Sequence, residues 1–418
     1  MKILFTSNLF PPKTQGGYEL RLFYLVHELK KEHDCVVVTG ESGGRSSSDE
    51  EGVRVHRVFP NQNPEKPTLF NHLTSIFKAQ RETITFSEIL DEEKPDHVVH
   101  FNLAGISPSI LSVPQLFGIP QSLWVEDVWM KSIQSGKDSI LHPWYQVHQE
   151  SSEGKFAKIA PLIRPFLSKN RWIFKNLKLA SQIHAANGLF VSHFQEWKNR
   201  NKSFNFDQKR VIQSGVPVSE TTKSESSLHF HDPIRLICAS ALTPDRGFDV
   251  LFEALSLLTE KQRSRFKLTL AGKPPNEWGA EWWKNFREEH KNSSVWNRIE
   301  HVGWISSAEM QNLLSEQDVL IFPSTRGEGM PLIMQEAMLN GCLVISSGSG
   351  GAGELCSEAG LPIFPANCPA ALKNMLLSLL SDLENATEKR TQLRDFARSH
   401  FDIRECAKTL VRYLARKD

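Results

Sequence analysis

Short apolar runs alternate with helical patterns along the first half of the chain. Tyr18–Lys31 places Leu22, Leu25, Val26 and Leu29 at helical spacing, which predicts an amphipathic helix. The apolar runs around it predict strands, and strands separated by helices indicate a parallel, doubly wound sheet. The strands predicted in this half are Lys2–Thr6, Asp34–Thr39, Val53–Phe59, His97–Phe101 and Gln121–Val125.

The second half repeats this plan after a polar stretch, Ser219–Pro233, that is suited to a linker. Its predicted strands are Arg235–Ser240, Lys267–Ala271, Ile299–Val302, Val319–Phe322 and Leu343–Ser346. Its predicted helices are Gly247–Leu258, Ser307–Glu316, Pro331–Asn340 and Pro369–Leu383. We therefore expect an α/β protein with two Rossmann-like, doubly wound parallel-sheet domains, residues 1–218 and 219–401, that face a central cleft. Ligands of such sheets bind beyond the carboxyl ends of the strands, so the cleft is the expected site.

Size and composition fit this plan, because 418 residues are too many for one ordinary core. A formal net charge of +1 gives no overall attraction to nucleic acid. The six cysteines are scattered without a C-x2-C pair, which is typical of reduced core residues and not of a disulfide framework or a zinc site. The first apolar run is too brief for a secretory signal, and no run approaches the length of a membrane span. We therefore expect a cytoplasmic protein.

The segment Pro323–Met338 carries the strongest chemical signal. A predicted strand leads into a tight turn at Gly327–Gly329, and Pro331 suits the first turn of the following helix. Backbone amides and the helix dipole at such a turn favour an anion. Glu328 lies in the loop, and Glu336 is expected about two turns into the helix on its inward face, where a carboxylate can accept hydrogen bonds from paired hydroxyls. Phosphate on the amides and hydroxyls on the carboxylates describe a sugar-nucleotide site, whereas the plainer interpretation is a pair of glutamates at a solvated helix start.

The same segment resembles the E-G-[FM]-[GP]-x4-E-A-M signature of family 4 retaining glycosyltransferases, whose two Rossmann-like domains form the architecture called GT-B. Further similarities follow the order of the family's motifs along nearly the whole chain. Ser214 stands where the family usually has asparagine, and the last helix, 402–418, resembles the one that packs back on the first domain. The other similar segments are Pro11–Gly17, His100–Ser107, Asn187–Ser192, Val211–Val216, Leu242–Asp249, Leu268–Gly272, His301–Trp304 and Ser346–Glu354.

The resemblance implies roles for particular residues around a nucleotide-sugar donor. Arg246 corresponds to the lysine that neutralises the donor pyrophosphate, while the arginine earlier in that motif falls on Ala241, so one phosphate contact is missing. Glu336 would hold the ribose hydroxyls and Glu328 the donor sugar. The remaining donor contacts are expected from Gly16, Gly17, Gly272, Val302, Gly329, Met330, Pro331 and Leu332. Family behaviour, together with the absence of a D-x-D motif, implies no metal and no other cofactor.

One departure from the family pattern concerns the fifth strand. Relatives place a v-H-D sequence there, beside the donor sugar, whereas this chain has Glu126 and Asp127 after Val125. An ionised carboxylate cannot donate a proton as a protonated imidazole can, but it can accept one or bind a sugar hydroxyl. Glu126 and Asp127 are therefore catalytic candidates, and the alternative is that they only orient neighbouring loops.

Residues 155–178 contain seven basic residues and no acidic one, interleaved with apolar side chains. Such a segment can dock on anionic lipid, which would suit a lipid-linked acceptor at the inner face of a membrane. Pro161 and Pro165 interrupt it, so it is not one continuous helix. The alternative is a solvated helix whose apolar side packs in the first domain.

Together these features predict a metal-independent, retaining hexosyltransferase that moves a sugar from a UDP-, GDP- or ADP-sugar to a glycan or lipid-linked acceptor, in glycan, polysaccharide or glycolipid biosynthesis. Two alternatives stay open. One is a degenerate GT-B protein that binds a sugar nucleotide or glycan without turnover, as Ala241 and Glu126 would suggest. The other is a relative of sucrose or trehalose synthases.

Overall fold

The computed structural model describes residues 1–13, 16–40, 46–60, 69–103, 105–125, 189–191, 209–218, 228–327 and 329–415. Within them the chain forms two compact units. The first comprises the described residues up to 191, residues 209–212 and residues 407–415, and the second comprises residues 213–406. The domain boundary at 218/219 and the return of helix 402–418 to the first domain stay predictions from the sequence.

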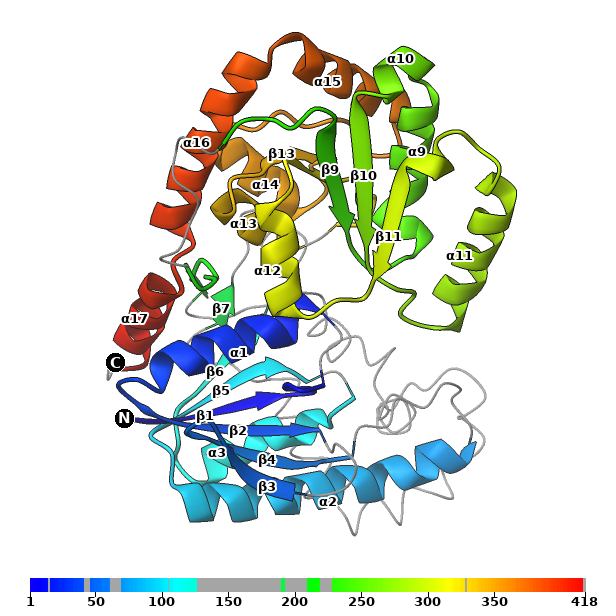
Figure 1. Cartoon of the computed structure of the whole chain (residues 1–418). Coiled ribbons are helices and arrows are strands. Elements are labelled where there is room, and N and C mark those ends of the chain that lie inside the picture. Colours follow the sequence, from blue (N-terminus) through cyan, green and yellow to red (C-terminus); the bar gives the residue numbers. More distant parts are fainter. Residues whose placement is uncertain are drawn as a thin grey trace. The chain divides into compact units, whose positions relative to one another are not determined.

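The first unit is built on an eight-stranded sheet with the order β3-β4-β2-β1-β5-β6-β7-β8 (Figure 1). All of its strand pairs are parallel except that of β3 with β4. Helix α1 lies on one face of the sheet, and α2 and α3 lie on the other (Figure 1). Its elements are β1 (Lys2–Ser7), α1 (Gly17–Leu29), β2 (Asp34–Gly40), β3 (Ser46–Glu50), β4 (Val53–Phe59), α2 (Leu69–Glu93), β5 (His97–Asn102), η1 (Pro108–Ser112), α3 (Val113–Leu116), β6 (Gln121–Val125), β7 (Leu189–Val191) and β8 (Lys209–Val211).

The second unit has a five-stranded parallel sheet with the order β11-β10-β9-β12-β13. Its first elements are β9 (Ile234–Ala239), η3 (Pro244–Arg246), α9 (Phe248–Ser256), α10 (Glu260–Arg263), β10 (Phe266–Ala271), α11 (Glu277–His290), η4 (Trp296–Arg298) and β11 (Ile299–Gly303). They are followed by α12 (Ser307–Ser315), β12 (Val319–Phe322), α13 (Leu332–Leu339), β13 (Leu343–Ser346), α14 (Gly351–Glu358), α15 (Pro369–Ser381) and α16 (Leu383–His400). Helix α17 (Ile403–Leu414) contains the division between the units at 406/407.

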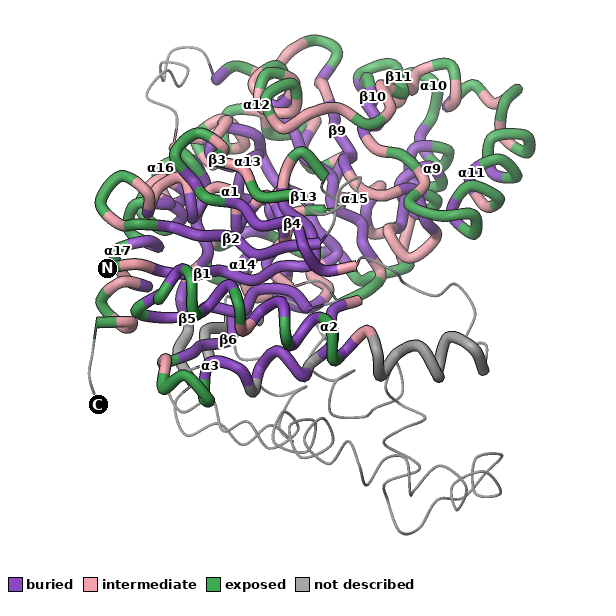
Figure 2. The backbone as a smooth tube through the Cα atoms, turned by 90° about the horizontal axis from the view of Figure 1, so that it is seen from below, coloured by how far each residue is buried: buried purple, intermediate pink, exposed green. Residues whose placement is uncertain are grey.

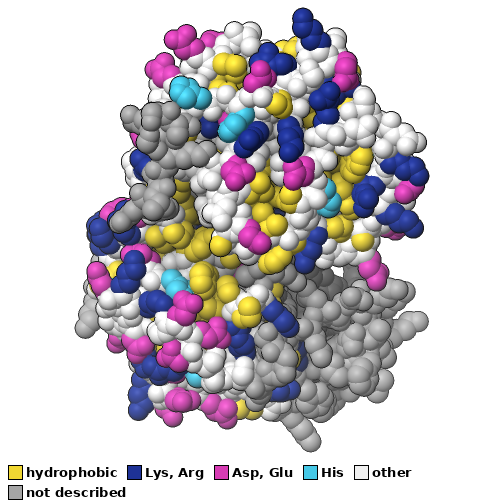
Figure 3. Space-filling model, viewed as in Figure 1, with side chains coloured by type: hydrophobic (Ala, Val, Ile, Leu, Met, Phe, Trp, Pro, Cys, Tyr) yellow, Lys and Arg dark blue, Asp and Glu magenta, His cyan; other side chains and the backbone are white. Residues whose placement is uncertain are grey.

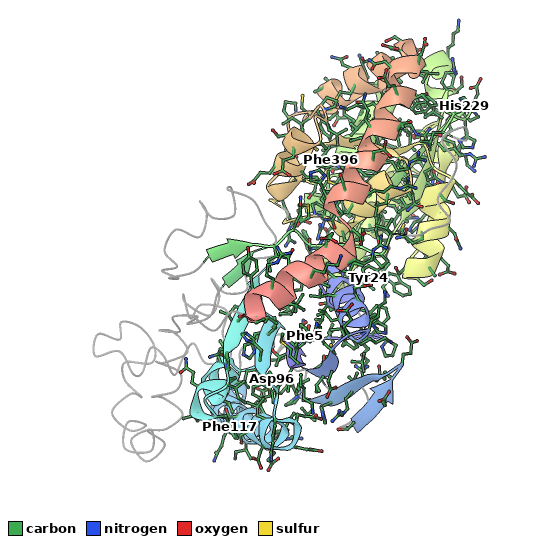
Figure 4. All side chains as sticks on the ribbon, turned by 90° about the vertical axis from the view of Figure 1, so that its left-hand side faces the viewer. Phe5, Tyr24, Asp96, Phe117, His229 and Phe396 are labelled. Atoms are coloured by element: carbon green, nitrogen blue, oxygen red, sulfur yellow. The ribbon has the colours of Figure 1, made fainter. Side chains whose placement is uncertain are left out.

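The strands form the core of each unit, as the buried segments of Figure 2 show. In the first unit Phe5, labelled in Figure 4, is fully buried and packs edge-on against Phe101 with ring centroids 6.1 Å apart. In the second unit Trp283 and Phe286 of α11 pack around Phe248 of α9. Every strand predicted from the sequence is present, with ends that differ by one residue at most. The two mainly parallel sheets, each in its own unit, therefore confirm the expected α/β fold class.

Several helix ends differ from the expectation. The helix expected at Gly247–Leu258 begins after Gly247, whose φ of +72° is left-handed and not helical. The helix expected at Pro369–Leu383 ends at Ser381, because the Asp382 side chain accepts a hydrogen bond from the Asn385 amide (3.1 Å) and so starts α16. Helices α2, α3, α10, α11, α14 and α16 and strands β3, β7 and β8 were not among the predicted elements.

Acidic and basic side chains are interspersed over both units in the view of Figure 3, in agreement with the net charge. All six cysteines are free thiols, and five of them are buried. Burial raises the pKa of Cys35 and of Cys238 to about 12, which keeps these thiols protonated and inert. In the described part of the chain no helix combines the length and apolar character needed to cross a bilayer.

Candidate functional site

The candidate site lies at the carboxyl edge of the five-stranded sheet, where loops follow the adjacent strands β9 and β12. The carbonyl of Asp245 in the first loop accepts hydrogen bonds from the amides of Thr325 (3.0 Å) and Arg326 (3.3 Å) in the second. The hydroxyl of Ser324 donates to the same carbonyl at 3.3 Å. One backbone oxygen thus joins the loop that carries Arg246 to the loop that leads to Glu328.

Gly247 allows the close approach of these two loops. A Cβ atom at this position would lie 2.0 Å from the carbonyl oxygen of Pro323, so no side chain fits without movement of the backbone. The left-handed φ of +72° is a second reason for glycine. Arg246 therefore ends η3 directly before a position whose geometry is fixed, and it is half-buried.

The amino end of α13 is the part of this edge best suited to an anion. The helix begins at Leu332 after Pro331, no described side chain caps it, and its first turn contains no acidic residue. The first amides of a helix have no partner within the helix, and the dipole there favours negative charge. Gly329 is half-buried, and Met330 and Leu332 are buried beside this end.

Glu336 is 6% exposed and lies in the fifth position of α13. It is thus just over one turn into the helix and not two, because the helix begins one residue after Pro331. The neighbouring Gln335 is fully buried and donates from Nε2 to the carbonyl of Ser214 (2.8 Å). This contact fixes α13 to residues 213–218, where the chain enters the second unit.

Two further predicted positions lie at the carboxyl ends of β10 and β11. Gly272 has φ of +141°, and a Cβ atom there would lie 1.8 Å from the carbonyl oxygen of Ser240. Its amide donates to the carbonyl of Gly303 (2.7 Å), which follows the half-buried Val302. The structure therefore brings Arg246, Gly272, Val302, Gly329, Met330, Pro331, Leu332 and Glu336 to one unit and to the loops and helix start along one edge of its sheet.

Gly16 and Gly17, the expected donor contacts in the first unit, lie at the start of α1. Gly16 caps α1, and its amide donates to the carboxylate of Glu19 (2.9 Å), which is 3% exposed. Gly17 is the first residue of the helix. The Gly16 amide thus already has a carboxylate partner, and a phosphate that used this amide would have to displace Glu19. A Cβ atom at Gly16 would meet nothing within 4 Å, so close packing does not require glycine here.

Glu328, Glu126, Asp127 and the basic segment 155–178 lie outside the described residues. The residues directly before Glu126 are nevertheless well fixed, because Tyr18 Oη lies 2.9 Å from the carbonyl oxygen of Phe101 and 2.6 Å from that of Trp124. The rings of Phe101 and Trp124 stack with centroids 5.0 Å apart. Tyr18 therefore joins the carboxyl ends of β5 and β6.

An ionisable pair, the half-buried Lys78 and the buried Glu82, lies against the loop that follows β5. Glu82 of α2 accepts a hydrogen bond from the Ser107 amide (2.7 Å), while Lys78 Nζ donates to the carbonyl of Gly105 (2.7 Å) and lies 3.7 Å from Glu82 Oε1. Burial raises the pKa of Glu82 to about 7, and it lowers the pKa of Lys78. This pair attaches α2 to Gly105 and Ser107, which belong to the segment His100–Ser107 that resembles a family motif.

Sequence reasoning gave no role to Tyr18, Arg326, Gln335 or Glu82. Arg326 could have been noticed as a cation inside the turn between β12 and α13. The partners of the other three are distant in sequence or are backbone atoms, so no local pattern marks them. Among the described residues, no group of three His, Cys, Asp or Glu side chains is placed to hold a metal ion.

Comparison with known proteins agrees with this arrangement. Residues 219–400 match the family model described as Glycosyl transferases group 1. The matched segment, which is less than half of the chain, carries a group 1 glycosyltransferase domain. The match covers the whole sheet edge described above, from the loop after β9 to α14.

Curated relatives of the chain include the putative colanic acid biosynthesis glycosyltransferase WcaL of Salmonella typhimurium, 29% identical over 170 residues, which are 39% of this chain and 40% of WcaL. The amylovoran biosynthesis glycosyltransferase AmsK of Erwinia amylovora is 24% identical over 45% of this chain and 46% of AmsK. These matches thus span less than half the length of the curated relatives. An uncharacterized 42.6 kDa protein in the cps region of Klebsiella pneumoniae is 23% identical over 85% of this chain and 87% of that protein.

Solved structures resemble the whole chain. HepE of Anabaena in complex with UDP and glucose has a TM-score of 0.68 at 16% identity, with 99% of each chain covered. Sucrose-phosphate synthase of Thermosynechococcus elongatus has a TM-score of 0.69 at 15% identity, with 98% of this chain and 97% of the synthase covered. At such identities the likeness shows the fold, which is that of GT-B glycosyltransferases.

Proposed function

We propose that this chain is a retaining glycosyltransferase that moves a sugar from a nucleotide-sugar to an acceptor hydroxyl. The bond between the anomeric carbon and the outer phosphate oxygen breaks, and a bond to the acceptor oxygen forms on the same face of the sugar. The nucleoside diphosphate leaves with the electron pair of the broken bond and takes up the proton that the acceptor hydroxyl loses.

The observation that carries the proposal is the uncapped amino end of α13 beside the loop that holds Arg246. The shared Asp245 carbonyl fixes these two loops together before any ligand binds. Such preorganised amides and a guanidinium can stabilise the charge that develops on a departing diphosphate. A leaving group stabilised in this way needs no metal ion. In this proposal Glu336 binds the ribose hydroxyls and Glu328 binds the donor sugar.

Relatives and structural neighbours support the proposed substrate class. WcaL is named for colanic acid biosynthesis and AmsK for amylovoran biosynthesis, and HepE binds UDP and UDP-glucose. We therefore propose a nucleotide-sugar donor and an acceptor in polysaccharide or glycolipid biosynthesis. Contact of residues 155–178 with anionic lipid, at the cytoplasmic face of a membrane, is part of the same proposal, and sedimentation with anionic vesicles tests it.

Calorimetric titration with UDP, GDP, ADP and CDP in the presence of EDTA tests the donor site. We expect tight binding of one of the four, because the α13 amides and Arg246 contact the diphosphate that all four share while the base decides among them. If none of them binds, the site is degenerate and the proposed activity is wrong.

Replacement of Glu328 by alanine separates an enzyme from a binding protein. We expect release of nucleoside diphosphate from the nucleotide-sugar to fall by at least about 100-fold, since removal of one group that acts only in the transition state costs about this much. Binding of the free diphosphate should change little.

The control for this variant is Glu300→Ala. Glu300 is a half-exposed carboxylate of the same unit that pairs with Lys267 at 2.7 Å, so its loss should leave turnover unchanged. Unchanged turnover in Glu328→Ala would contradict the role assigned to Glu328.

A further inference from the structure

A diphosphate at the proposed site lacks one of the cations that the resemblance implies. Ala241 stands where an arginine is expected, two residues after the end of β9, and Arg246 is the remaining cation of that loop. An arginine contact to a phosphate is often bidentate and is stronger than a neutral hydrogen bond. A second cation from another element would restore the balance of charge.

Arg326 is such a cation, and it comes from the loop of the neighbouring strand. Its amide donates to the Asp245 carbonyl (3.3 Å), so its backbone is fixed to the residue that precedes Arg246. Its Nη1 lies 3.5 Å from Asp245 Oδ2, and its side chain is 52% exposed. Arg326 also lies five residues before Pro331, where the uncapped end of α13 begins.

We propose that Arg326 contacts the outer phosphate of the donor diphosphate in place of the arginine that Ala241 does not supply. This inference rests on the proposed function and assigns a binding role to a residue that neither motif marks. Asp245 would then be the counter-ion of the resting state, which holds the guanidinium beside the site until a phosphate competes for it. A guanidinium has five N–H donors, so it can stay paired with Asp245 and still donate to a phosphate.

The alternative is that Arg326 and Asp245 form only an ordinary surface ion pair without a role in binding. An exposed pair contributes about 0–1 kcal/mol, and its loss would then affect stability slightly and nucleotide binding not at all. Binding of a diphosphate and of the corresponding monophosphate distinguishes the two interpretations, because only the diphosphate has the outer phosphate.

The experiment compares UDP with UMP, or GDP, ADP or CDP with its monophosphate if the wild type prefers that base, by calorimetry in EDTA. The variants are Arg326→Gln, Arg326→Gln with Ala241→Arg, and the control Arg298→Gln. Arg298 is a partly exposed arginine of the same unit that pairs with Glu260 at 2.8 Å. Circular dichroism confirms that each variant folds.

We expect Arg326→Gln to weaken diphosphate binding about tenfold, the loss of one charged hydrogen bond, and to leave monophosphate binding unchanged. The control should bind both ligands as the wild type does, and Ala241→Arg should recover most of the loss. Unchanged diphosphate binding in Arg326→Gln, or an equal loss for the monophosphate, would overturn the inference even if Ala241→Arg does not fold. A wild type that binds no nucleotide would instead refute the proposed function.

Discussion

Two glycines with similar left-handed backbones, Gly247 and Gly303, have different surroundings. Gly247 has φ of +72° and lies against the Pro323 carbonyl, whereas Gly303 has φ of +74° and would have nothing within 4 Å of a Cβ atom. Replacement of Gly303 by alanine should therefore cost only the conformational penalty of about 1–2 kcal/mol.

Gly247→Ala should cost at least about 2 kcal/mol more, because the loops after β9 and β12 must also separate. The same movement displaces Arg246, so nucleotide binding should weaken in this variant and not in Gly303→Ala. Urea unfolding and calorimetry measure the two effects. Equal stability and equal affinity of the two variants would show that the close approach of the loops has no role.

The sequence could identify individual residues only where a local motif marked them. Arg246 and Glu336 stood in recognisable patterns, and the structure places both at one sheet edge. The roles of Gln335 and Arg326 depend on hydrogen bonds to the carbonyls of Ser214 and Asp245, which lie 121 and 81 residues away in sequence. No periodicity or spacing contains that information, because it arises only when the chain folds.

At the scale of elements, the attachment of α2 to the loop after β5 depends on the charge of Glu82. Burial raises the pKa of its carboxyl from the ordinary 4.5 to about 7, so the folded state holds a proton that the unfolded chain has lost. The stabilisation is complete below about pH 4.5 and disappears as pH rises through 7. Its size is on the order of 3 kcal/mol.

Glu82→Gln should remove this dependence on pH, since a glutamine side chain is always neutral and can still accept from the Ser107 amide. We expect the wild type to be as stable as the variant near pH 5 and less stable near pH 8. Urea denaturation at several pH values measures the difference. Burial lowers the pKa of His97 to about 4 and that of His100 to about 3, but both histidines are present in the wild type and in the variant, so their contributions cancel. A difference in stability that does not change with pH would exclude a protonated Glu82.

Elements were predictable where the apolar pattern was strong. The ten strands that were expected are rich in apolar residues, and all ten are present. Helix α16 was missed because most of its residues are polar, although Leu393, Arg394 and Ala397 are buried. Strand β3 was missed because Ser46–Glu50 has no apolar residue, and its pairing with β4 alone defines it.

At the scale of the whole molecule, the two units have separate cores, and some contacts should stabilise only one of them. Arg390 of α16 is 1% exposed and donates to the carbonyl of Gly341 (2.6 Å) and to Asp318 Oδ1 (3.1 Å). It also contacts the carbonyl of His229, which Figure 4 labels in the same unit (3.4 Å). All of these partners belong to the second unit.

Arg390→Leu leaves the buried Asp318 carboxylate without its main counter-ion, which typically costs about 3–5 kcal/mol. Hydrogen exchange should show faster global opening of the second unit and unchanged exchange in the first. The control Arg265→Leu breaks an exposed pair with Asp232 and should change neither. Equal destabilisation of both units would mean that they unfold as one.

The polar strand β3 has a consequence for the behaviour of the protein in solution. A sheet edge with free backbone groups is a template for other chains, and β4 contains Val53, Val55 and Val58 in a buried stretch. Because β3 covers that edge with serines and two acidic residues, the next chain to approach meets a charged, poorly adhesive strand. We therefore expect residues 46–50 to disfavour edge-to-edge association of the sheet, and a version of the protein made for concentrated solutions should keep them.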